Sequence, residues 1–341
     1  MTYLVGKIAL DVTAGAPNNG EGENNVGVVK KLWVGREAYP YVSAQAFRRW
    51  VRDSMPAQEG RSPVKREGKG QKQQAYTDGR PDKYLDDDLF GYMVAVKGEN
   101  FQRDTVLATG TLVSVAPRRP SQDFGTMSRG FPADAHPVIH QHELYTAELA
   151  GDILLDLPRV GTFEQAGGGL RRALRADAAA EALAAGAVET TFRDVASVQL
   201  PLPERRRRVG VLLRTLAGVR GGAQRALHYG DRSPAFVLLA PVKGGSNPFT
   251  RVLSVKDQRV RFDQDTFAQE FTAWADELDG QVMIGWSPGF LGDQRDQALR
   301  RFEPEIAAGQ LVIDHPRTAL HTLASKVESG QNDAWFQDPA T

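Results

Sequence analysis

Three histidines in the segment HPVIHQHE, namely His136, His140 and His142, are the residues best suited to chemistry. On a strand, His140 and His142 would point to the same face because they are two positions apart, and Glu143 follows directly. Imidazole and carboxylate groups bind divalent metals, so a metal-assisted hydrolase using His140, His142 and Glu143 is one hypothesis. The orders HExxH and HxxEH are absent, however, and we expect a histidine group at the start of a strand and no bound metal.

Other catalytic motifs are absent from the sequence. Neighbouring glycines occur at 167–169, 221–222 and 244–245, but none belongs to a GxxxxGK[ST] or strand-borne GxGxxG motif. Ser287 lies in GWSPG, which lacks the GxSxG spacing of an activated nucleophile. The chain has no cysteine, which excludes disulfides and thiolate metal sites. We therefore expect a protein that is not an enzyme and uses no cofactor.

Basic residues are more informative in their placement than in their number. The 42 basic and 42 acidic residues give a formal net charge of +0, so the whole chain provides no argument for nucleic-acid binding. Four local groups lie on core-poor segments or on a helix flank. They are Lys30 and Lys31; Arg48, Arg49 and Arg52; Lys65, Arg66, Lys69 and Lys72; and Arg118 and Arg119. Such groups are typical of proteins that hold phosphates, although ordinary solvated surface explains each one taken alone.

Residues 121–131, SQDFGTMSRGF, place apolar side chains among small and polar ones. Phe124, Met127 and Phe131 would be exposed on an irregular excursion between two strands. Exposed apolar tips either contact another protein or act as a wedge that separates stacked bases. The residues alone leave both alternatives open.

A double glycine follows the helix-like run 203–219. Gly221 and Gly222 precede Ala223 and Gln224. Glycine lets the backbone turn sharply and lets another group approach the amides closely. We therefore expect a close neighbour at this turn.

Hydrophobic periodicity predicts the elements that position these residues. Alternation over 2–13 predicts a half-buried strand, and Ser43 is a suitable cap for a helix over 43–53. The other predicted elements are strands over 105–117, 142–157, 235–242 and 281–286, and helices over 203–219, 263–280 and 316–327.

Three segments do not fit this pattern. Residues 56–88 contain almost no core-forming side chains and are predicted to be a long mobile loop, ordered only by a partner, with Asp86, Asp87 and Asp88 as a solvated acidic group. Residues 117–135 are predicted to protrude as an irregular excursion. Residues 164–189 are rich in alanine and are predicted to be helical.

The order strand, helix, strand, strand, helix, strand remains when these segments are set aside. It is typical of the ferredoxin-like fold, so the predicted fold class is α+β, with an antiparallel sheet and helices on one face. RNA-recognition domains have the same frame. No apolar run approaches the roughly 18 residues of a membrane span. We expect a cytoplasmic protein without membrane contact.

Six segments, in order over nearly the whole length, resemble the Cas7 family in its DevR/Cst2 branch. These proteins are the backbone subunits of type I-A and I-B CRISPR Cascade effector complexes. The segments are VGKIALDV with PNNGEGENN; YVSAQAFRRWVRD; DLFGYM; SQDFGTM with HPVIHQHELYTAELAGDILLDL; LAGVRGGAQRALHYGDRSPAFVLLAPVKGGSNPF; and DHPRTALHTLASKV.

The resemblance implies one domain over 1–341, with an RRM-like palm, a finger insertion and a β-hairpin thumb. The palm would comprise 1–55, 89–116, 141–160 and 200–330, the finger about 56–88 and the thumb about 117–140. The family's helix start S-x-Q-x-x-R, which lies against the guide backbone, matches Ser43, Gln45, Arg48 and Arg49. Its Gly-Gly-Ala-x turn, whose amides the guide RNA would approach closely, matches Gly221, Gly222, Ala223 and Gln224, and its thumb-tip wedge matches Phe124 and Met127. Lys30 and Lys31 are added as RNA contacts by position and charge only.

The function implied by the resemblance is that many copies polymerise along a CRISPR RNA and present it for pairing with target DNA in antiviral defence. The implied partners are the CRISPR RNA, target DNA through the guide, neighbouring Cas7 copies and the Cascade subunits Cas5, Cas8, Cas6 and the small subunit. A monomeric RNA-binding regulator and the hydrolase remain as alternatives.

Overall fold

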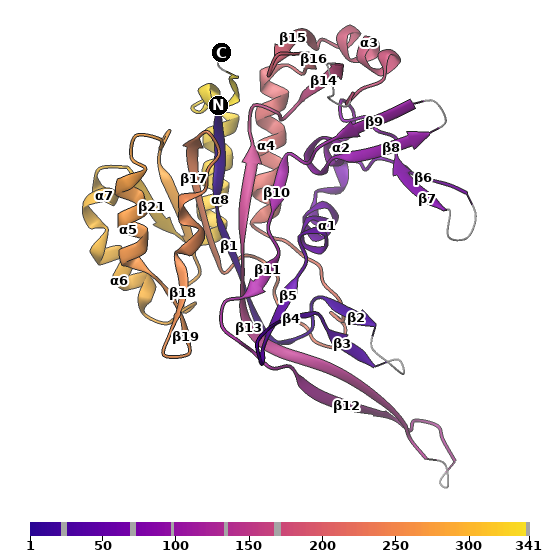
Figure 1. Cartoon of the computed structure of the whole chain (residues 1–341), viewed down its shortest axis with the longest axis vertical. Coiled ribbons are helices and arrows are strands. Elements are labelled where there is room, and N and C mark those ends of the chain that lie inside the picture. The colour runs from indigo at the N-terminus through magenta and orange to yellow at the C-terminus, as the bar shows by residue number, and fades with distance from the viewer. Residues whose placement is uncertain (22–25, 69–72, 97–98, 133–135, 167–171, 339–341) are drawn as a thin grey trace.

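The computed structural model describes residues 1–21, 26–68, 73–96, 99–132, 136–166 and 172–338. Among these residues the main element is a 12-stranded sheet that runs through the middle of the molecule (Figure 1). The order along its main path is β21 (Leu311–Asp314), β20 (Val282–Trp286), β17 (Phe236–Lys243), β1 (Thr2–Gly15), β13 (Val138–Asp156), β11 (Leu112–Ser114), β5 (Glu37–Val42) and β4 (Lys31–Val34). β20 and β21 are parallel, so the sheet is mixed rather than purely antiparallel.

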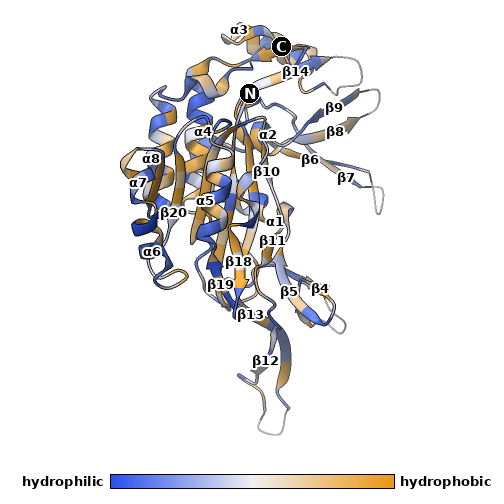
Figure 2. Ribbon diagram, turned by 60° about the vertical axis from the view of Figure 1, so that its left-hand side comes forward, coloured by the Kyte–Doolittle hydropathy of each residue, from blue (hydrophilic) through white to orange (hydrophobic). Residues whose placement is uncertain are grey.

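β1 is buried on both faces, not on one. Leu4 and Ile8 belong to a core on one side of the sheet, whereas Val5 and Ala9 belong to a core on the other side. The first core includes residues of α4 (Leu202–Leu216) and α8 (Pro316–Glu328), and the second includes residues of α5 (Gln264–Ala273) and α6 (Gln294–Arg301). The predictions of a half-buried strand and of helices on one face were therefore wrong, because β1 is a central strand covered from both sides. Figure 2 shows these hydrophobic strands between the more polar helices.

Most of the predicted regular elements are present. The predicted strands over 2–13, 235–242 and 281–286 correspond to β1, β17 and β20, and the helices over 203–219 and 316–327 correspond to α4 and α8. The strand predicted over 105–117 is divided into β10 (Leu107–Thr109) and β11, with Gly110 close to the Asp152 backbone between them. The helix predicted over 263–280 ends earlier, at Ala273, and short α7 (Glu303–Ala307) was not predicted.

Helix α1 (Ala44–Ser54) forms as its sequence predicts. The Ser43 hydroxyl accepts a hydrogen bond from the Ala46 amide at 3.3 Å and caps the helix. Phe47, Trp50 and Val51 are buried and fix the face that packs on the sheet. The opposite face of α1 is therefore presented to solvent.

Residues 56–88 are not the long irregular loop that was predicted. They contain η2 (Ala57–Glu59), the hairpin of β6 (Val64–Glu67) and β7 (Gln74–Thr77), and the first part of α2 (Leu85–Phe90). A second hairpin, β8 (Tyr92–Val96) with β9 (Glu99–Arg103), follows. The prediction failed because polar hydrogen bonds, rather than apolar side chains, fix much of this segment.

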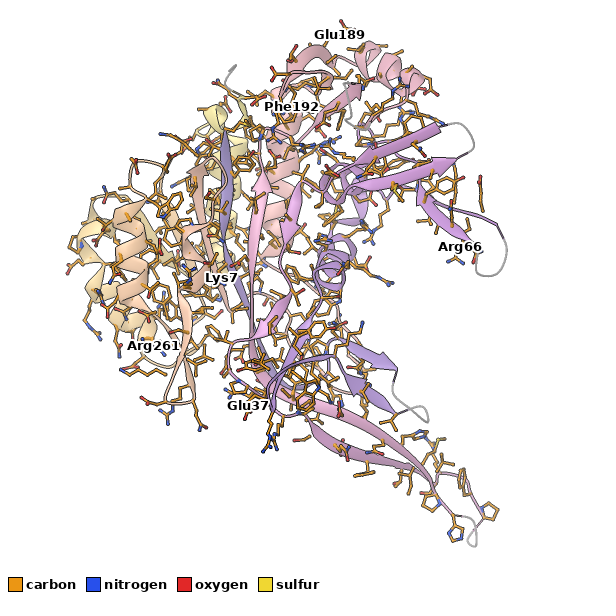
Figure 3. All side chains as sticks on the ribbon, viewed as in Figure 1. Lys7, Glu37, Arg66, Glu189, Phe192 and Arg261 are labelled. Atoms are coloured by element: carbon orange, nitrogen blue, oxygen red, sulfur yellow. The ribbon has the colours of Figure 1, made fainter. Side chains whose placement is uncertain are left out.

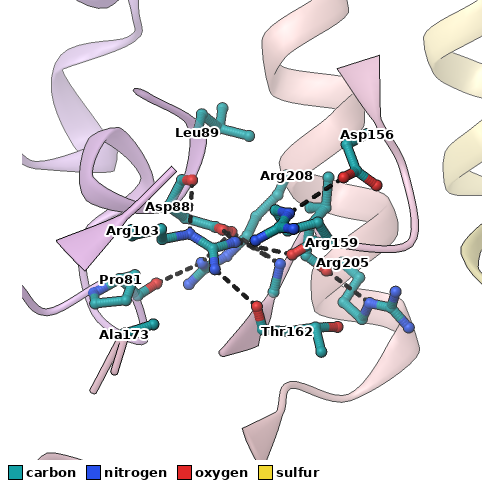
Figure 4. A network of polar contacts seen from close by, with 12 residues as sticks. Pro81, Asp88, Leu89, Arg103, Asp156, Arg159, Thr162, Ala173, Arg205 and Arg208 are labelled. Carbon is teal, nitrogen blue, oxygen red and sulfur yellow. Dashed lines mark hydrogen bonds and ion pairs between the residues drawn. The ribbon is translucent and has the colours of Figure 1, made fainter. Parts of the chain in front are cut away.

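Asp88 shows how these polar contacts work (Figure 4). Its buried carboxylate pairs with Arg103 of β9 and with Arg208 of α4, the latter at 2.7 Å between Oδ2 and Nη1. The Gly161 amide donates to the same carboxylate at 3.0 Å. Asp86 and Asp87 are also buried, so the predicted solvated acidic group is wrong. Asp88 instead ties α2 and β9 to α4.

A long hairpin projects from the sheet at 117–140. β12 (Ser121–Met127) pairs antiparallel with the first residues of β13, and the short β2 (Asn19–Glu21) and β3 (Gly27–Val29) lie at its base. The predicted excursion therefore exists, but it is a regular hairpin. Because β13 continues from this hairpin into the sheet, the hairpin and the body of the protein share one strand.

The alanine-rich segment forms part of a small separate layer. β14 (Thr162–Ala166), β16 (Val195–Gln199) and β15 (Val188–Phe192) form a three-stranded sheet, against which α3 (Ala176–Ala184) packs. The predicted helix over 164–189 is therefore shorter and flanked by strands. The glycines at 167–169 lie outside the described residues.

The second core is completed by short elements after β17. They are η4 (Pro248–Arg251) and the hairpin of β18 (Leu253–Lys256) and β19 (Arg259–Phe262); η5 (Asp333–Phe336) packs against the first core. The fold class is α+β, as predicted. No helix in the described parts of the chain is long and apolar enough to cross a membrane.

Candidate nucleic-acid interface

The exposed face of α1 lies between two projecting hairpins. β6–β7 and β12–β13 extend on the same side of the sheet as α1, one on either side of it in Figure 1. Figure 3 shows Arg66 on the β6–β7 hairpin, well separated from Arg261 on the opposite side of β1. A nucleic-acid strand that ran between the two hairpins would therefore contact α1.

Arg48 and Arg52 are cations without an ion-pair partner among the described residues. Arg48 is half-buried, and its Nη1 donates to Thr109 Oγ1 at 3.4 Å. The Arg52 guanidinium carbon lies 4.9 Å from the centroid of the Phe90 ring. Asp53, the acid on this helix, pairs with Arg49 and Arg61 instead. Burial lowers the pKa of Arg48, and the nearby Arg52 lowers it further, so a bound anion would stabilise both charges.

The other predicted residues of α1 have different environments. Gln45 is exposed, and the Arg49 side chain is 78% exposed with its Nε 3.5 Å from Asp53 Oδ2. Such an exposed pair is worth little and leaves Arg49 available to an anion. The Ser43 hydroxyl is already an acceptor in the helix cap. α1 therefore brings together Gln45, Arg48 and Arg49, whereas Ser43 has a structural role.

Lys31 is committed to an internal contact. Its ammonium donates to both carboxylate oxygens of Glu143, at 2.8 and 2.9 Å, and the Val29 amide donates to the same group at 2.9 Å. Lys30 lies on the same segment, and its stem packs near Gly20. The predicted lysine pair thus supplies less free charge than its sequence indicates.

The same contact bears on the hydrolase hypothesis. Glu143 is 8% exposed and already has three hydrogen bonds. His140 is exposed on the hairpin, whereas His142 is buried with its Nε2 3.2 Å from Asp123 Oδ2, although the two atoms are not aligned for a hydrogen bond. Within the described residues, no group of three His, Cys, Asp or Glu side chains is arranged to hold a metal ion.

Gly221 and Gly222 have a close neighbour, and it is part of the protein itself. A Cβ on Gly221 would lie 2.5 Å from Trp50 Cγ, and a Cβ on Gly222 would lie 3.2 Å from the Pro17 carbonyl oxygen. Gly222 also has a φ of +93°, which strongly favours glycine. The Ala223 amide donates to Pro17 at 2.8 Å. The turn therefore packs directly on α1, which places the predicted turn and the predicted helix in one surface.

Gln224 begins a short turn beyond the glycines. Its φ of +53° is uncommon for a residue with a side chain, and its carbonyl accepts from the His228 amide at 2.8 Å. The His228 ring lies 5.0 Å from the His142 ring, between centroids. This turn therefore connects α1 to the base of the β12–β13 hairpin.

Phe124 and Met127 lie on opposite faces of the β12–β13 hairpin. They are 61% and 53% exposed and three positions apart on a regular strand, so their side chains alternate. Met127 pairs with Val138, and Ile139 lies on the face of Phe124. The two predicted residues therefore do not form a single wedge. Each face of the hairpin carries its own pair of exposed apolar side chains.

Val138 and Ile139 are interface candidates that the sequence analysis missed. They are 50% and 64% exposed. They lie between His136 and His140, and only the histidines of this segment were predicted to have a role. The four polar residues 140–143 separate Val138 and Ile139 from the apolar residues of β13, so hydrophobic periodicity gave no signal that the strand extends into the hairpin.

Comparison with known proteins gives matches at the level of structure. The sequence matches no protein-family model. No curated protein sequence matches it either. A solved chain described as "CRISPR RNA-guided surveillance complex" superposes with a TM-score of 0.54 at 12% identity, covering 95% of this chain and 99% of that chain. A second, described as "CRISPR RNA-guided surveillance complex, pre-nicking", gives a TM-score of 0.58 at 11% identity over 96% of this chain and 100% of that chain.

The chain shares the fold of these subunits. The match extends over nearly the full length of both proteins. At this level of identity the likeness establishes the fold alone.

Proposed function

We propose that this protein is a Cas7-like backbone subunit of a type I CRISPR Cascade complex, in the DevR/Cst2 branch. Copies assemble head to tail along the CRISPR RNA and present it for pairing with target DNA, without catalysis by this chain. The body of the fold is the palm, residues 56–88 with the β6–β7 hairpin are the finger, and the β12–β13 hairpin is the thumb. Its partners are Cas5, Cas8, Cas6 and the small subunit, in the cytoplasm.

The observation that carries the proposal is the pair Arg48 and Arg52 on α1. Both guanidinium groups lack a carboxylate partner among the described residues, and Arg48 is half-buried. A charge placed in this way is stabilised by an anion from outside the chain. A phosphate of the guide supplies that anion without any reading of bases.

The β12–β13 hairpin supports the same proposal. Its two faces each carry exposed apolar side chains, Phe124 with Ile139 and Met127 with Val138. In a head-to-tail assembly, one face contacts the RNA and displaces a base, while the other contacts the neighbouring copy. A monomeric protein would gain little from exposing both.

The alternatives make different use of the same residues. The hydrolase requires Glu143, which is held by Lys31 and the Val29 amide, so no observation favours it. A monomeric RNA-binding regulator accounts for the arginines of α1 but not for the two apolar faces of the hairpin.

The test is to express the chain with a repeat-spacer RNA and to measure the absorbance ratio and the mass by light scattering. The proposal predicts an RNA-loaded multimer whose mass increases with spacer length. A complex of one copy per RNA at every length would support the monomeric regulator. An RNA-free monomer would overturn the proposal.

A further inference from the structure

A cavity of about 570 Å³ lies beside α1, between α4 and α8. None of the residues proposed above to contact RNA lines it. We refer to it as the α4–α8 cavity. Its charged and titratable lining residues are Asp53, Glu59, Arg214, Arg220, Arg317 and His321. Asp53 is shared with α1, one turn after Arg49, so the cavity adjoins the exposed face of that helix.

The acidic residues of the cavity are neutralised by other arginines. Asp53 Oδ1 pairs with Arg61 at 2.9 Å, and Glu59 pairs with Arg207 at 2.7 Å. Arg214 is itself paired with Glu328. These three pairs leave Arg220 and Arg317 as the cations that have no ion pair in the described parts of the chain.

Arg220 is held in place by α1. Its amide donates to Ser54 Oγ at 2.7 Å, and the Ser54 hydroxyl lies 2.9 Å from the Arg220 carbonyl oxygen and 2.7 Å from the Trp50 carbonyl oxygen, the nearer acceptor. Arg317 lies in the first turn of α8, and His321 follows one turn later on the same face. The two arginines and the imidazole therefore converge on one cavity from two fixed elements.

The electrostatics of His321 are consistent with an excess of positive charge. Burial lowers the pKa of His321, and Arg317 and Arg214 lower it further. An anion that enters the cavity would stabilise the protonated form of His321, because the acidic residues of the cavity are already paired with other arginines.

We infer that the α4–α8 cavity is a second phosphate-binding site, in which Arg220 and Arg317 hold a phosphate of single-stranded nucleic acid that crosses α1 at Arg49. The inference rests on the proposed function for the identity of the ligand. Guanidinium groups suit phosphate because their planar donors match its oxygens. A nucleic-acid strand is favoured over an acidic peptide because the cavity continues the arginine face of α1.

The test compares RNA binding of the full-length wild type with that of the double variant Arg220→Ala/Arg317→Ala. Fluorescence anisotropy with a labelled single-stranded RNA should show weaker binding by the variant, and a salt dependence that is less steep by up to about 1.4 in log–log slope, because two cations are lost at about 0.7 each. The double variant Arg259→Ala/Arg300→Ala, which removes two exposed arginines outside the cavity, is the matched control and should bind like wild type. Equal slopes for the cavity variant and wild type would overturn the inference.

A second readout separates failure of the site from failure of the proposed function. NMR titration of the His321 ring should show that its pKa rises when RNA is added to wild type, whereas added RNA should leave it unchanged in the cavity variant. If wild type binds no RNA, the proposed function fails, and inorganic tripolyphosphate then tests the cavity alone. A rise in the pKa of His321 with tripolyphosphate would support the site, and no change would overturn it.

Discussion

Replacing Arg48 tests the assignment of α1 to a phosphate backbone most directly. Arg48 has no carboxylate partner, so its charge is available to an external anion, and Arg48→Ala removes one phosphate contact per copy. For single-stranded nucleic acid each such contact contributes about 0.7 to the slope of log affinity against log salt concentration. Between 50 and 200 mM salt, wild-type affinity should therefore fall about 2.6-fold more than that of Arg48→Ala.

The assay is fluorescence anisotropy with a labelled single-stranded RNA at several salt concentrations. Arg48→Lys keeps the charge and should keep the slope, which separates charge from shape. Arg259→Ala on β19, on the other side of β1 from α1, should behave like wild type. Folding should be unaffected, because burial and Arg52 already disfavour the charge of Arg48. A slope unchanged by Arg48→Ala would refute the assignment.

Three further predictions follow from the packing. Gly221→Ala should lower the free energy of unfolding by about 1–3 kcal/mol in urea denaturation, because its Cβ would meet Trp50 and its φ of +156° disfavours a side chain; a Trp50→Ala background should remove the part due to the contact and leave the part due to the backbone. Asp88→Asn should destabilise by about 3–5 kcal/mol, since two buried guanidinium groups each lose their buried carboxylate partner and keep only the less buried Glu164 or Glu204, whereas the exposed Asp53→Asn should change stability by less than about 1 kcal/mol; equal effects would contradict the buried network. A photoreactive group should crosslink to bound RNA from position 124 or from position 127 but not from both, because their side chains point to opposite faces of the hairpin.

The regular elements could be predicted because their signals are local. The cap at Ser43 and the spacing of Phe47, Trp50 and Val51 lie within one helix, and both are present in α1. The burial of β1 on its second face could not be predicted, because it depends on helices that follow more than 200 residues later in the chain. The presence of β1 is readable from its own sequence, but the layers that cover it are not.

The candidate site was predictable in its position and less so in its chemistry. Periodicity and resemblance both pointed to the α1 surface and to the glycine turn, which the structure brings together through Trp50. The pairing of Lys31 with Glu143 joins residues more than 100 positions apart and has no local signal. Asp88 was misjudged for the same reason, since its two arginines come from other elements.

The position of β1 in the sheet has a consequence for how the chain folds. Tyr3 pairs with Asp156 on one side and with Val242 on the other, so the centre of the sheet is built from segments far apart in the chain. Contacts of such large sequence separation slow folding, because a long loop must close before any of them forms. We expect slow refolding, and until β13 and β17 join it, the apolar β1 would be an unpaired strand prone to aggregation.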